Sequence, residues 1–189
     1  MGLGSGGPQR VFLNVTKGKF INKAANMEGV TFDGKLVAIE RKEDEYEGKK
    51  VWKGVIVMRD EADGKDYAIS FLESGYFSLG FFSRISSVDV DRAFTLGVTQ
   101  SDKNEKISFC YIKQDGQLIK KDENFPKPSK VEVSPGNEVT VWTDCVKKFM
   151  EVGALINAKL MNGPGNDSAS SNNSTVADTG AQADDDLPF

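Results

Sequence analysis

Three β-type segments between residues 35 and 74 constrain the fold of this chain more than any other feature. They span residues 35–44, 50–60 and 65–74, and together they are rich in the Val, Ile, Tyr, Phe and Trp residues that favour strands. The short connections EYEG and EADG contain the glycine and acidic residues of hairpin turns. The sequence therefore predicts an antiparallel meander of three long strands.

Further strands and one short helix are predicted on both sides of this meander. Residues 10–22 show two short β segments around a Lys-Gly turn, and residues 93–100 and 106–113 form another hairpin. The apolar residues of 74–89 fit either a short amphipathic helix or an irregular strand, and we favour the helix. This order is typical of the OB-fold, a five-stranded Greek-key barrel. We therefore expect a mostly β, OB-fold-like barrel of five to six strands with one short internal helix.

A longer helix is predicted near the C-terminus. Residues 124–144 contain three prolines and predict a wandering connection with short extended pieces. Residues 143–160 then predict a helix that begins with a Thr143 or Asp144 cap and packs on the barrel or on a second subunit, so that a homo-oligomer remains open. Its apolar face is formed by Val146, Phe149, Met150, Gly153, Ile156 and Leu160.

The two ends of the chain have the composition of unstructured segments. Residues 1–9 are rich in glycine and predict a flexible arm, and residues 162–189 consist mainly of Gly, Ser, Asn, Thr, Ala and Asp and predict a disordered tail. The domain proper is therefore expected over residues 10–161. A flexible chain as long as this tail spans roughly 30 Å.

The residue types argue against most enzyme classes. The chain has no histidine, which removes the commonest general base and the commonest metal ligand. Its two cysteines, Cys110 and Cys145, lack metal-ligand spacing and are expected to be reduced, which suits a cytoplasm. No apolar run is long enough for a membrane span. We expect a protein without catalytic activity, metal or cofactor.

Charge is distributed unevenly along the chain. Five of the 28 acidic residues and none of the 24 basic residues lie after residue 161, although the whole chain carries a formal charge of -4. The domain itself is therefore close to neutral, and the tail holds the acidic excess. A near-neutral domain can still present a basic face to a nucleic acid.

The chain ends in the letters ADDDLPF, an unusual combination of dense negative charge and apolar residues. Behind a low-complexity tail and a β-rich body, this ending resembles the C-terminal tip of bacterial and bacteriophage single-stranded DNA-binding proteins. Asp184, Asp185 and Asp186 match the acidic run of that family, Leu187 the aliphatic position, Pro188 the proline and Phe189 the terminal aromatic residue. The body is not similar to the common bacterial members, so the resemblance is to a divergent phage-type or mobile-element member.

The resemblance implies both partners and a location. In that family the tip is bound by replication, recombination and repair proteins, while the body coats single-stranded DNA. The location implied is the cytoplasm of a bacterial cell, or of an infected host cell if the gene belongs to a bacteriophage.

The tip also has a binding mechanism of its own. Phe189 offers a ring for an apolar pocket and a free carboxylate for a basic residue, while Pro188 limits the conformations lost on binding. A role in solubility alone would explain the aspartates but not Leu187 and Phe189. We also expect Asp184, Asp185 and Asp186 to compete with DNA for a basic groove.

A groove for a single strand needs flat side chains for the bases and cations for the phosphates. On the second β segment, strand alternation places Lys53 and Arg59 on the outer face and Trp52 near a rim. For Tyr67 we weigh core packing above stacking, whereas for Phe109 the two stand equal. The candidate residues are Arg41, Tyr46, Trp52, Lys53, Arg59, Tyr67, Phe109, Tyr111, Lys113, Lys120 and Lys121.

The sequence thus favours a non-catalytic single-stranded DNA-binding protein that recruits replication, recombination or repair proteins. One alternative is an adaptor whose β body binds protein and not DNA. Another, given less weight, is a carboxylate-metal nuclease built from residues in a probable hairpin turn, where acidic side chains are expected anyway. The carboxylates concerned are Asp60, Glu61, Asp63 and Asp66.

Overall fold

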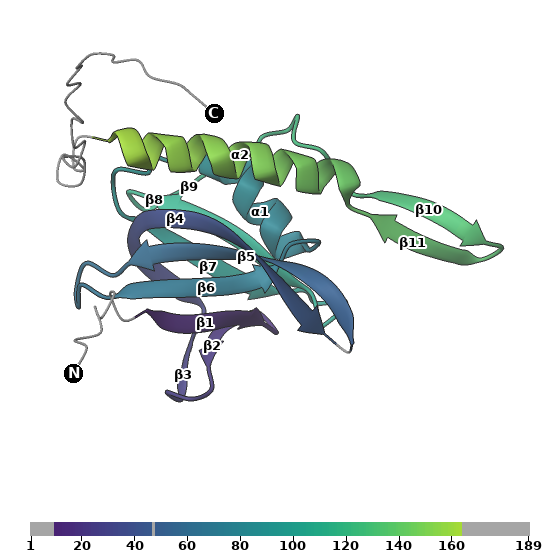
Figure 1. Ribbon diagram of the computed structural model, residues 1–189, viewed down its shortest axis with the longest axis horizontal. Helices are drawn as coiled ribbons and strands as arrows, with labels where there is room; N and C mark the ends of the chain where they lie inside the picture. The colour runs from purple at the N-terminus through teal and green to yellow at the C-terminus, as the bar shows by residue number, and fades with distance from the viewer. Residues whose placement is uncertain (1–9, 47, 164–189) are drawn as a thin grey trace, which may run out of the picture.

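The computed structural model describes residues 10–46 and 48–163. The predicted N-terminal arm, almost all of the predicted tail and the whole acidic tip lie outside these residues. Within them the protein is mostly β, with two helices (Figure 1).

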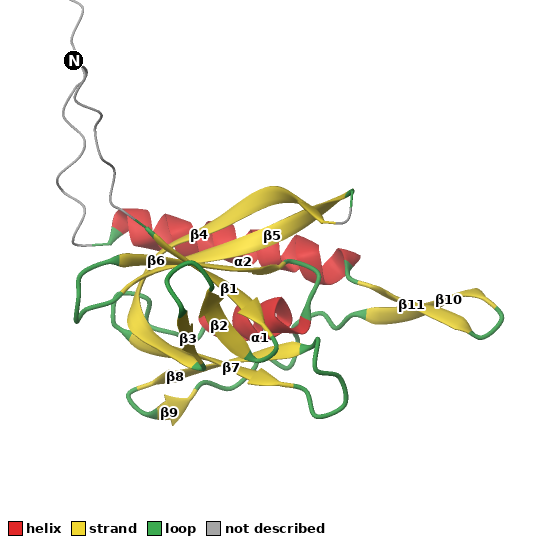
Figure 2. Cartoon of the chain, turned by 90° about the horizontal axis from the view of Figure 1, so that it is seen from below, coloured by secondary structure: helices red, strands yellow, loops and turns green. Residues whose placement is uncertain are grey.

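Nine strands form one sheet in the order β3-β2-β1-β6-β5-β4-β7-β8-β9. The sheet curls into a half-barrel that holds α1 on its inner side (Figure 2). Its strands are β1 (Val11–Thr16), β2 (Lys19–Asn22), β3 (Met27–Gly29), β4 (Thr31–Tyr46), β5 (Lys49–Arg59), β6 (Asp66–Leu72), β7 (Phe94–Gln100), β8 (Ser108–Gln114) and β9 (Gln117–Leu118).

The predicted meander is confirmed. β4 pairs with β5 and β5 with β6, both antiparallel. Alternation along these strands directs Ile39, Ile56 and Ile69 into the main core, where Ile56 lies opposite both of the others. The predicted hairpin of β7 and β8 is also present.

The sheet has more strands than the five to six that the sequence predicted. The additional ones include β3 and β9, which are three and two residues long and carry no hydrophobic pattern. The N-terminal hairpin of β1 and β2 joins the same sheet, because β1 pairs in parallel with β6. Nothing in the sequence indicated this pairing. Its turn reaches the connection between β7 and β8, where the Gly18 N–H donates to Ser108 Oγ at 3.0 Å. The N-terminal hairpin thus lies between β6 and the β7–β8 pair.

Both predicted helices are present. α1 (Tyr76–Ile85) contacts β8, and α2 (Thr143–Asn162) lies over β4 and α1. The predicted cap of α2 is wrong: the N-cap is Trp142, without a side-chain capping bond. Met150, predicted on the apolar face, is exposed, because the buried stripe instead follows the residues that contact β4 and α1. This stripe is Cys145, Phe149, Val152, Gly153 and Ile156.

α2 also covers a free edge of the sheet. β7 pairs with β4 only as far as Gly34, which leaves later residues of that β4 edge without a strand partner. Asn157 of α2 fills this role, because its side chain accepts from the Ile39 N–H at 2.9 Å and donates to the Ile39 carbonyl at 2.7 Å. The buried backbone groups of Ile39 are therefore satisfied by a side chain.

The predicted wandering connection is instead partly a regular hairpin. β10 (Ser129–Ser134) and β11 (Asn137–Val141) pair with each other and project from the body (Figure 1). The prolines at 126, 128 and 135 dominated the sequence pattern, but they lie before the hairpin and in its turn. The described part of the chain contains no helix that is both long and apolar enough to cross a membrane.

Packing of α2 on the body can be tested through Phe149. Its ring is 2% exposed and stacks between Phe82 and Phe125, with ring centroids 4.8 and 5.8 Å away. Phe149→Ala should lower the free energy of unfolding by about 3–5 kcal/mol because it leaves a cavity. Leu155→Ala on the same helix, where Leu155 is 64% exposed, should change it by less than about 0.5 kcal/mol. Urea unfolding measures both, and equal losses would contradict this packing.

Candidate functional site

Three aromatic rings meet on one face of the protein, where α1 begins. The ring of Tyr76 lies 5.6 Å from that of Phe109 and 5.2 Å from that of Trp142, measured between centroids. Phe109 is 38% exposed, and the other two are half-buried. We call Tyr76, Phe109 and Trp142 the aromatic cluster. It joins residues from α1, β8 and the end of the β10–β11 hairpin.

The alternation of β8 determines which of its side chains face outward. Cys110, Ile112 and Gln114 are buried, so Phe109, Tyr111 and Lys113 lie on the opposite face. Burial also raises the pKa of the Cys110 thiol well above its ordinary value, which keeps this group protonated and unreactive.

A glycine on the neighbouring strand makes room for Tyr111. Gly97 lies opposite Tyr111 in the pairing of β7 with β8, and a Cβ atom at Gly97 would come within 2.0 Å of the tyrosine ring. The ring therefore lies flat over the β7 backbone. The Lys113 ammonium is 5.8 Å from the centre of this ring.

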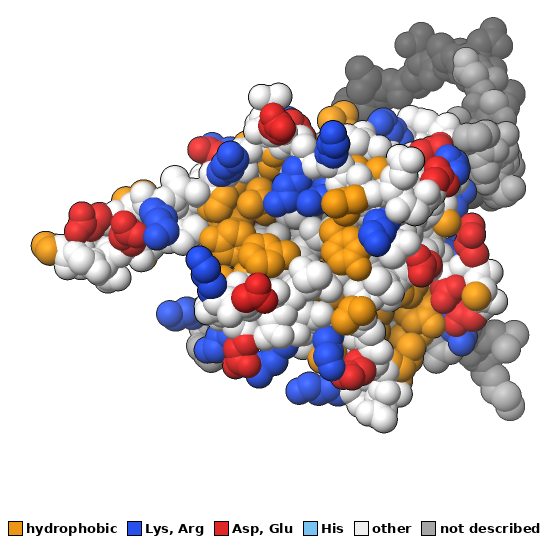
Figure 3. Space-filling view, turned by 180° about the vertical axis from the view of Figure 1, so that it is seen from behind, with side chains coloured by type: hydrophobic (Ala, Val, Ile, Leu, Met, Phe, Trp, Pro, Cys, Tyr) orange, Lys and Arg blue, Asp and Glu red, His pale blue; other side chains and the backbone are white. Residues whose placement is uncertain are grey.

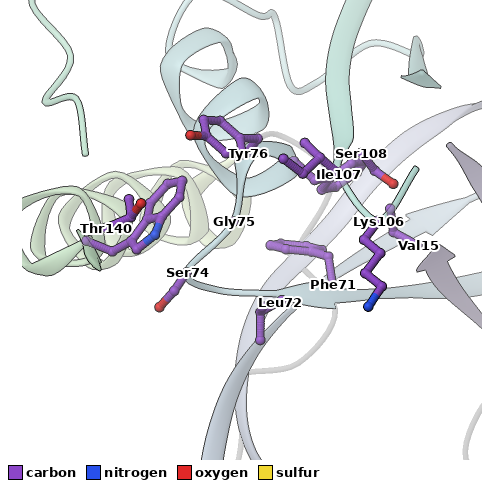
Figure 4. Close-up of a pocket in the computed structure, with 12 residues that line it drawn as sticks. Val15, Phe71, Leu72, Ser74, Gly75, Tyr76, Lys106, Ile107, Ser108 and Thr140 are labelled. Carbon is purple, nitrogen blue, oxygen red and sulfur yellow. The ribbon is translucent and has the colours of Figure 1, made fainter. Parts of the chain in front are cut away.

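A pocket of about 290 Å³ opens beside the aromatic cluster. Its walls include Phe71 at the end of β6, Tyr76 and Trp142 of the cluster, and Lys106 from the connection between β7 and β8 (Figure 4). The pocket therefore combines apolar walls with a cation at its edge.

Four lysines at the pocket and along β8 have no carboxylate partner among the described residues. Lys120 and Lys121 lie beside β8, because the segment after β9 continues along that strand and the Ile119 N–H donates to the Ile112 carbonyl at 2.9 Å. Figure 3 shows hydrophobic side chains gathered near the base of the projecting hairpin, with Lys and Arg side chains next to them. Within residues 10–46 and 48–163, no ion pair is formed by Lys106, Lys113, Lys120 or Lys121.

Other predicted residues lie on β4 and β5 and are already engaged. The Arg41 guanidinium stacks 3.8 Å over the Trp52 ring and forms two hydrogen bonds with Glu73, at 2.7 and 3.0 Å. These bonds to Glu73 raise the pKa of Arg41. Glu73 therefore compensates the positive charge of Arg41, which was expected from the sequence to contact DNA phosphates. Tyr46 ends β4, and its side chain is not among those described.

The remaining three predicted residues are either paired with a carboxylate or buried. Lys53 pairs with Asp44 at 2.7 Å, and Arg59 pairs with Asp66 at 2.7 Å. Tyr67 is 7% exposed and packs in the core. Base stacking by Tyr67 would need an exposed ring, so this part of the predicted groove is wrong, and the core packing that we weighed above it is confirmed.

The structure thus separates the predicted residues into two groups. Those on β4, β5 and β6 are paired or buried where their side chains are described, apart from the exposed Trp52 beneath Arg41. The second group lies together: Phe109, Tyr111 and Lys113 on one face of β8, and Lys120 and Lys121 beside that strand. Sequence reasoning missed the aromatic partners from other elements and one lysine. Tyr76 was read only as part of a helix pattern, and Trp142 stood in the proline-rich connection. The outward alternation at 109, 111 and 113 was the only signal, and it could not indicate which residues join it.

Three of the carboxylates in the acidic turn of the nuclease alternative already form hydrogen bonds or an ion pair within or next to that turn. Asp60 accepts the Ala62 N–H at 2.7 Å, Asp63 accepts the Lys65 N–H at 2.9 Å, and Asp66 is bound by Arg59. The hydrogen bond from the Lys65 backbone is the main cause that lowers the pKa of Asp63. Among the described residues, no group of three or more acidic, cysteine or histidine side chains could hold a metal ion.

No family model, curated protein or solved structure matches this chain. The interpretation of the site therefore depends on its geometry and on the sequence.

The placement of the Tyr111 ring gives a testable prediction. Gly97→Ala should force the ring away from β7 and lower the free energy of unfolding by about 1–3 kcal/mol, as overpacking does. The change should be visible as altered ring resonances of Tyr111 in NMR spectra. Gly29→Ala is the control, because a Cβ there meets its nearest atom at an ordinary 3.6 Å. An unmoved Tyr111 ring in Gly97→Ala would contradict this placement.

Proposed function

We propose that this protein binds single-stranded DNA through the aromatic cluster and the cations around it, without catalysis. The observation that carries the proposal is the combination of partly exposed, touching rings with lysines that form no ion pair with any carboxylate of the described residues. Rings of this kind can stack on bases, each stacked base contributing about 1–3 kcal/mol, and lysines can bind the phosphates between them. Because part of the affinity would come from phosphate contacts, binding should weaken as salt rises.

We further infer an OB-fold-like core. The order β4, β5, β6, α1, β7, β8 corresponds to five strands with a helix between the third and fourth, and β4 lies between β5 and β7. Oligonucleotides bind OB-folds on the second and third strands and at loops such as the one between strands four and five. Here the pocket lies between the end of β6 and the connection from β7 to β8. The N-terminal hairpin paired with β6 is an addition to that plan.

The acidic tip remains a prediction for protein partners. In this proposal Asp184, Asp185 and Asp186 are attracted to a basic rim on a replication, recombination or repair protein, and Phe189 enters a pocket there. The described chain ends one residue after α2, so the tether begins close to the body.

The second candidate function is the adaptor that binds protein through its β body. The exposed side chains of Val131, Val133 and Val139 on the projecting hairpin favour it, because apolar residues on a surface can mark a protein contact. An adaptor would leave the tryptophan fluorescence unchanged when oligo-dT is added.

Fluorescence of one tryptophan tests DNA binding at this site. The chain has two tryptophans, Trp52 and Trp142, so Trp52→Phe leaves only the ring in the aromatic cluster. Oligo-dT should quench this ring, and adding Phe109→Ala should weaken binding about tenfold through the loss of stacking. Phe12→Ala, which removes an exposed ring from β1, is the matched control. Binding that leaves Trp142 unquenched would refute the site, and absence of binding would refute the function.

Deletion of residues 164–189 tests competition between the tail and DNA. The cut leaves α2 intact, because that helix ends at Asn162. At low salt the shortened protein should bind oligo-dT more tightly than the full chain, since a nearby anion no longer competes for the cations. Replacing Asp184, Asp185 and Asp186 by Asn in the full chain should reproduce most of the gain. Unchanged affinity in both variants would end this part of the proposal.

A further inference from the structure

Arg84 is a buried cation with only neutral partners. It lies in the last turn of α1, its residue is 8% exposed, and no carboxylate in the described chain forms an ion pair with it. Its Nε donates to the Ile119 carbonyl at 3.0 Å and one terminal nitrogen to the Gly80 carbonyl at 2.8 Å. Burying a charge is costly unless an opposite charge accompanies it. Among residues 10–46 and 48–163, this cation therefore has no counter-charge.

Lys121 is a second cation beside Arg84. The segment that carries it runs along α1, because Arg84 binds the Ile119 carbonyl and the Asp122 N–H donates to the Ser83 carbonyl at 2.7 Å. The Asp122 carboxylate is used in a turn, where it accepts the Asn124 N–H at 2.9 Å. Burial, and then the charge of Arg84, lower the pKa of Lys121, while burial lowers that of Arg84. The two positive charges thus lie near each other, and neither forms an ion pair with a carboxylate of the described residues.

The remaining hydrogen-bond donors suit a phosphate group. A guanidinium has five N–H donors, and Arg84 forms two side-chain hydrogen bonds with the part of the chain that the structure describes. Lys121 is exposed as a residue although its amino group is partly desolvated, and its ammonium adds three more N–H donors. A phosphate presents several oxygens that can accept from both groups at once. A fully apolar ligand would leave both charges uncompensated.

The position of Arg84 relative to the aromatic cluster indicates where the phosphate comes from. Tyr76 and Arg84 are eight residues apart on α1, about 12 Å along the helix axis. The residues lie along β8 in the same order, since Tyr76 contacts Phe109 while Arg84 contacts Ile119, which pairs with Ile112. A strand whose bases stack on the cluster could therefore pass Arg84 within a few nucleotides.

We propose that Arg84 and Lys121 together bind one phosphate group, namely a phosphodiester of the bound single strand. The source of the phosphate rests on the proposed function of DNA binding. The pair of cations without a counter-charge among the described residues is observed independently of that function. Free inorganic phosphate shares the same chemistry, and the experiments separate the two sources.

Neutral linkages in the DNA test the strand as the source. Oligo-dT carrying a single uncharged methylphosphonate, moved along the strand, should bind the full protein about tenfold more weakly at one or two positions. Lys121→Gln should reduce this position dependence and lower the slope of log affinity against log salt by about 0.7, as expected for one lost phosphate contact. Lys121→Arg should restore both. Lys23→Gln, in the turn between β2 and β3, is the matched control and should leave the position dependence unchanged.

Inorganic phosphate tests the two cations without DNA. In NMR spectra of the full protein, phosphate should shift the Arg84 Nε–H resonance, and Lys121→Gln should weaken the response. If phosphate shifts this resonance but the protein does not bind oligo-dT, the phosphate site stands and the proposed function fails. If oligo-dT binds and Lys121→Gln changes neither slope nor position dependence, the strand is not the source and the proposal is overturned. If the protein responds neither to inorganic phosphate nor to oligo-dT, both the phosphate site and the proposed function are overturned.

A variant of the arginine itself completes the test. Arg84→Lys keeps the charge but cannot hold both carbonyl groups with the same geometry. It should bind phosphate more weakly than the wild type while urea unfolding shows a folded protein. Wild-type phosphate affinity in folded Arg84→Lys and in Lys121→Gln would contradict the site.

Discussion

The close approach of α1 to β8 is the contact on which the arrangement of the site depends. Gly80 makes it possible, because a Cβ atom there would lie 2.6 Å from the Cys110 carbonyl oxygen. With the helix at this distance, Tyr76 reaches Phe109 at one end and Arg84 reaches Ile119 at the other. The aromatic cluster and the two cations therefore have a common structural cause. A larger residue at position 80 would separate α1 from β8 and disturb both.

The elements outside the meander complete the face that α1 begins. The N-terminal hairpin brings Val15 to one wall of the pocket, and the end of the β10–β11 hairpin brings Trp142 to the other. α2 fixes the position of the second hairpin, because it starts directly after Trp142 and is anchored by Phe149 against Phe82. Four segments far apart in the chain, around Val15, residues 71–77, residues 106–108 and residues 140–142, thus meet at one pocket.

The cations near the aromatic cluster differ from those predicted on β4 and β5 in how their charges are paired. The domain is nearly neutral by composition, yet its cations fall into two classes. Arg41, Lys53 and Arg59 are held by carboxylates, and their charge is compensated within the protein. Lys106 and Lys121 form no ion pair with the described residues, so their charge remains available to an external anion. A domain whose net charge is close to zero is therefore compatible with a local surface that binds phosphate.

The sequence by itself determined the meander, the β7–β8 hairpin, both helices and the fact that Phe109, Tyr111 and Lys113 share one face of their strand, whereas only the structure showed that this face points outward. These features depend on alternation, turn residues and helical spacing, which act between neighbours in the chain. Only the tertiary structure decided that Tyr67 is buried, that β1 pairs with β6 and that Trp142 joins Tyr76. It also decided which cations find a carboxylate, as when Glu73 compensates Arg41. Such contacts join residues that are distant in sequence, and a local pattern carries no information about the partner that folding brings to it.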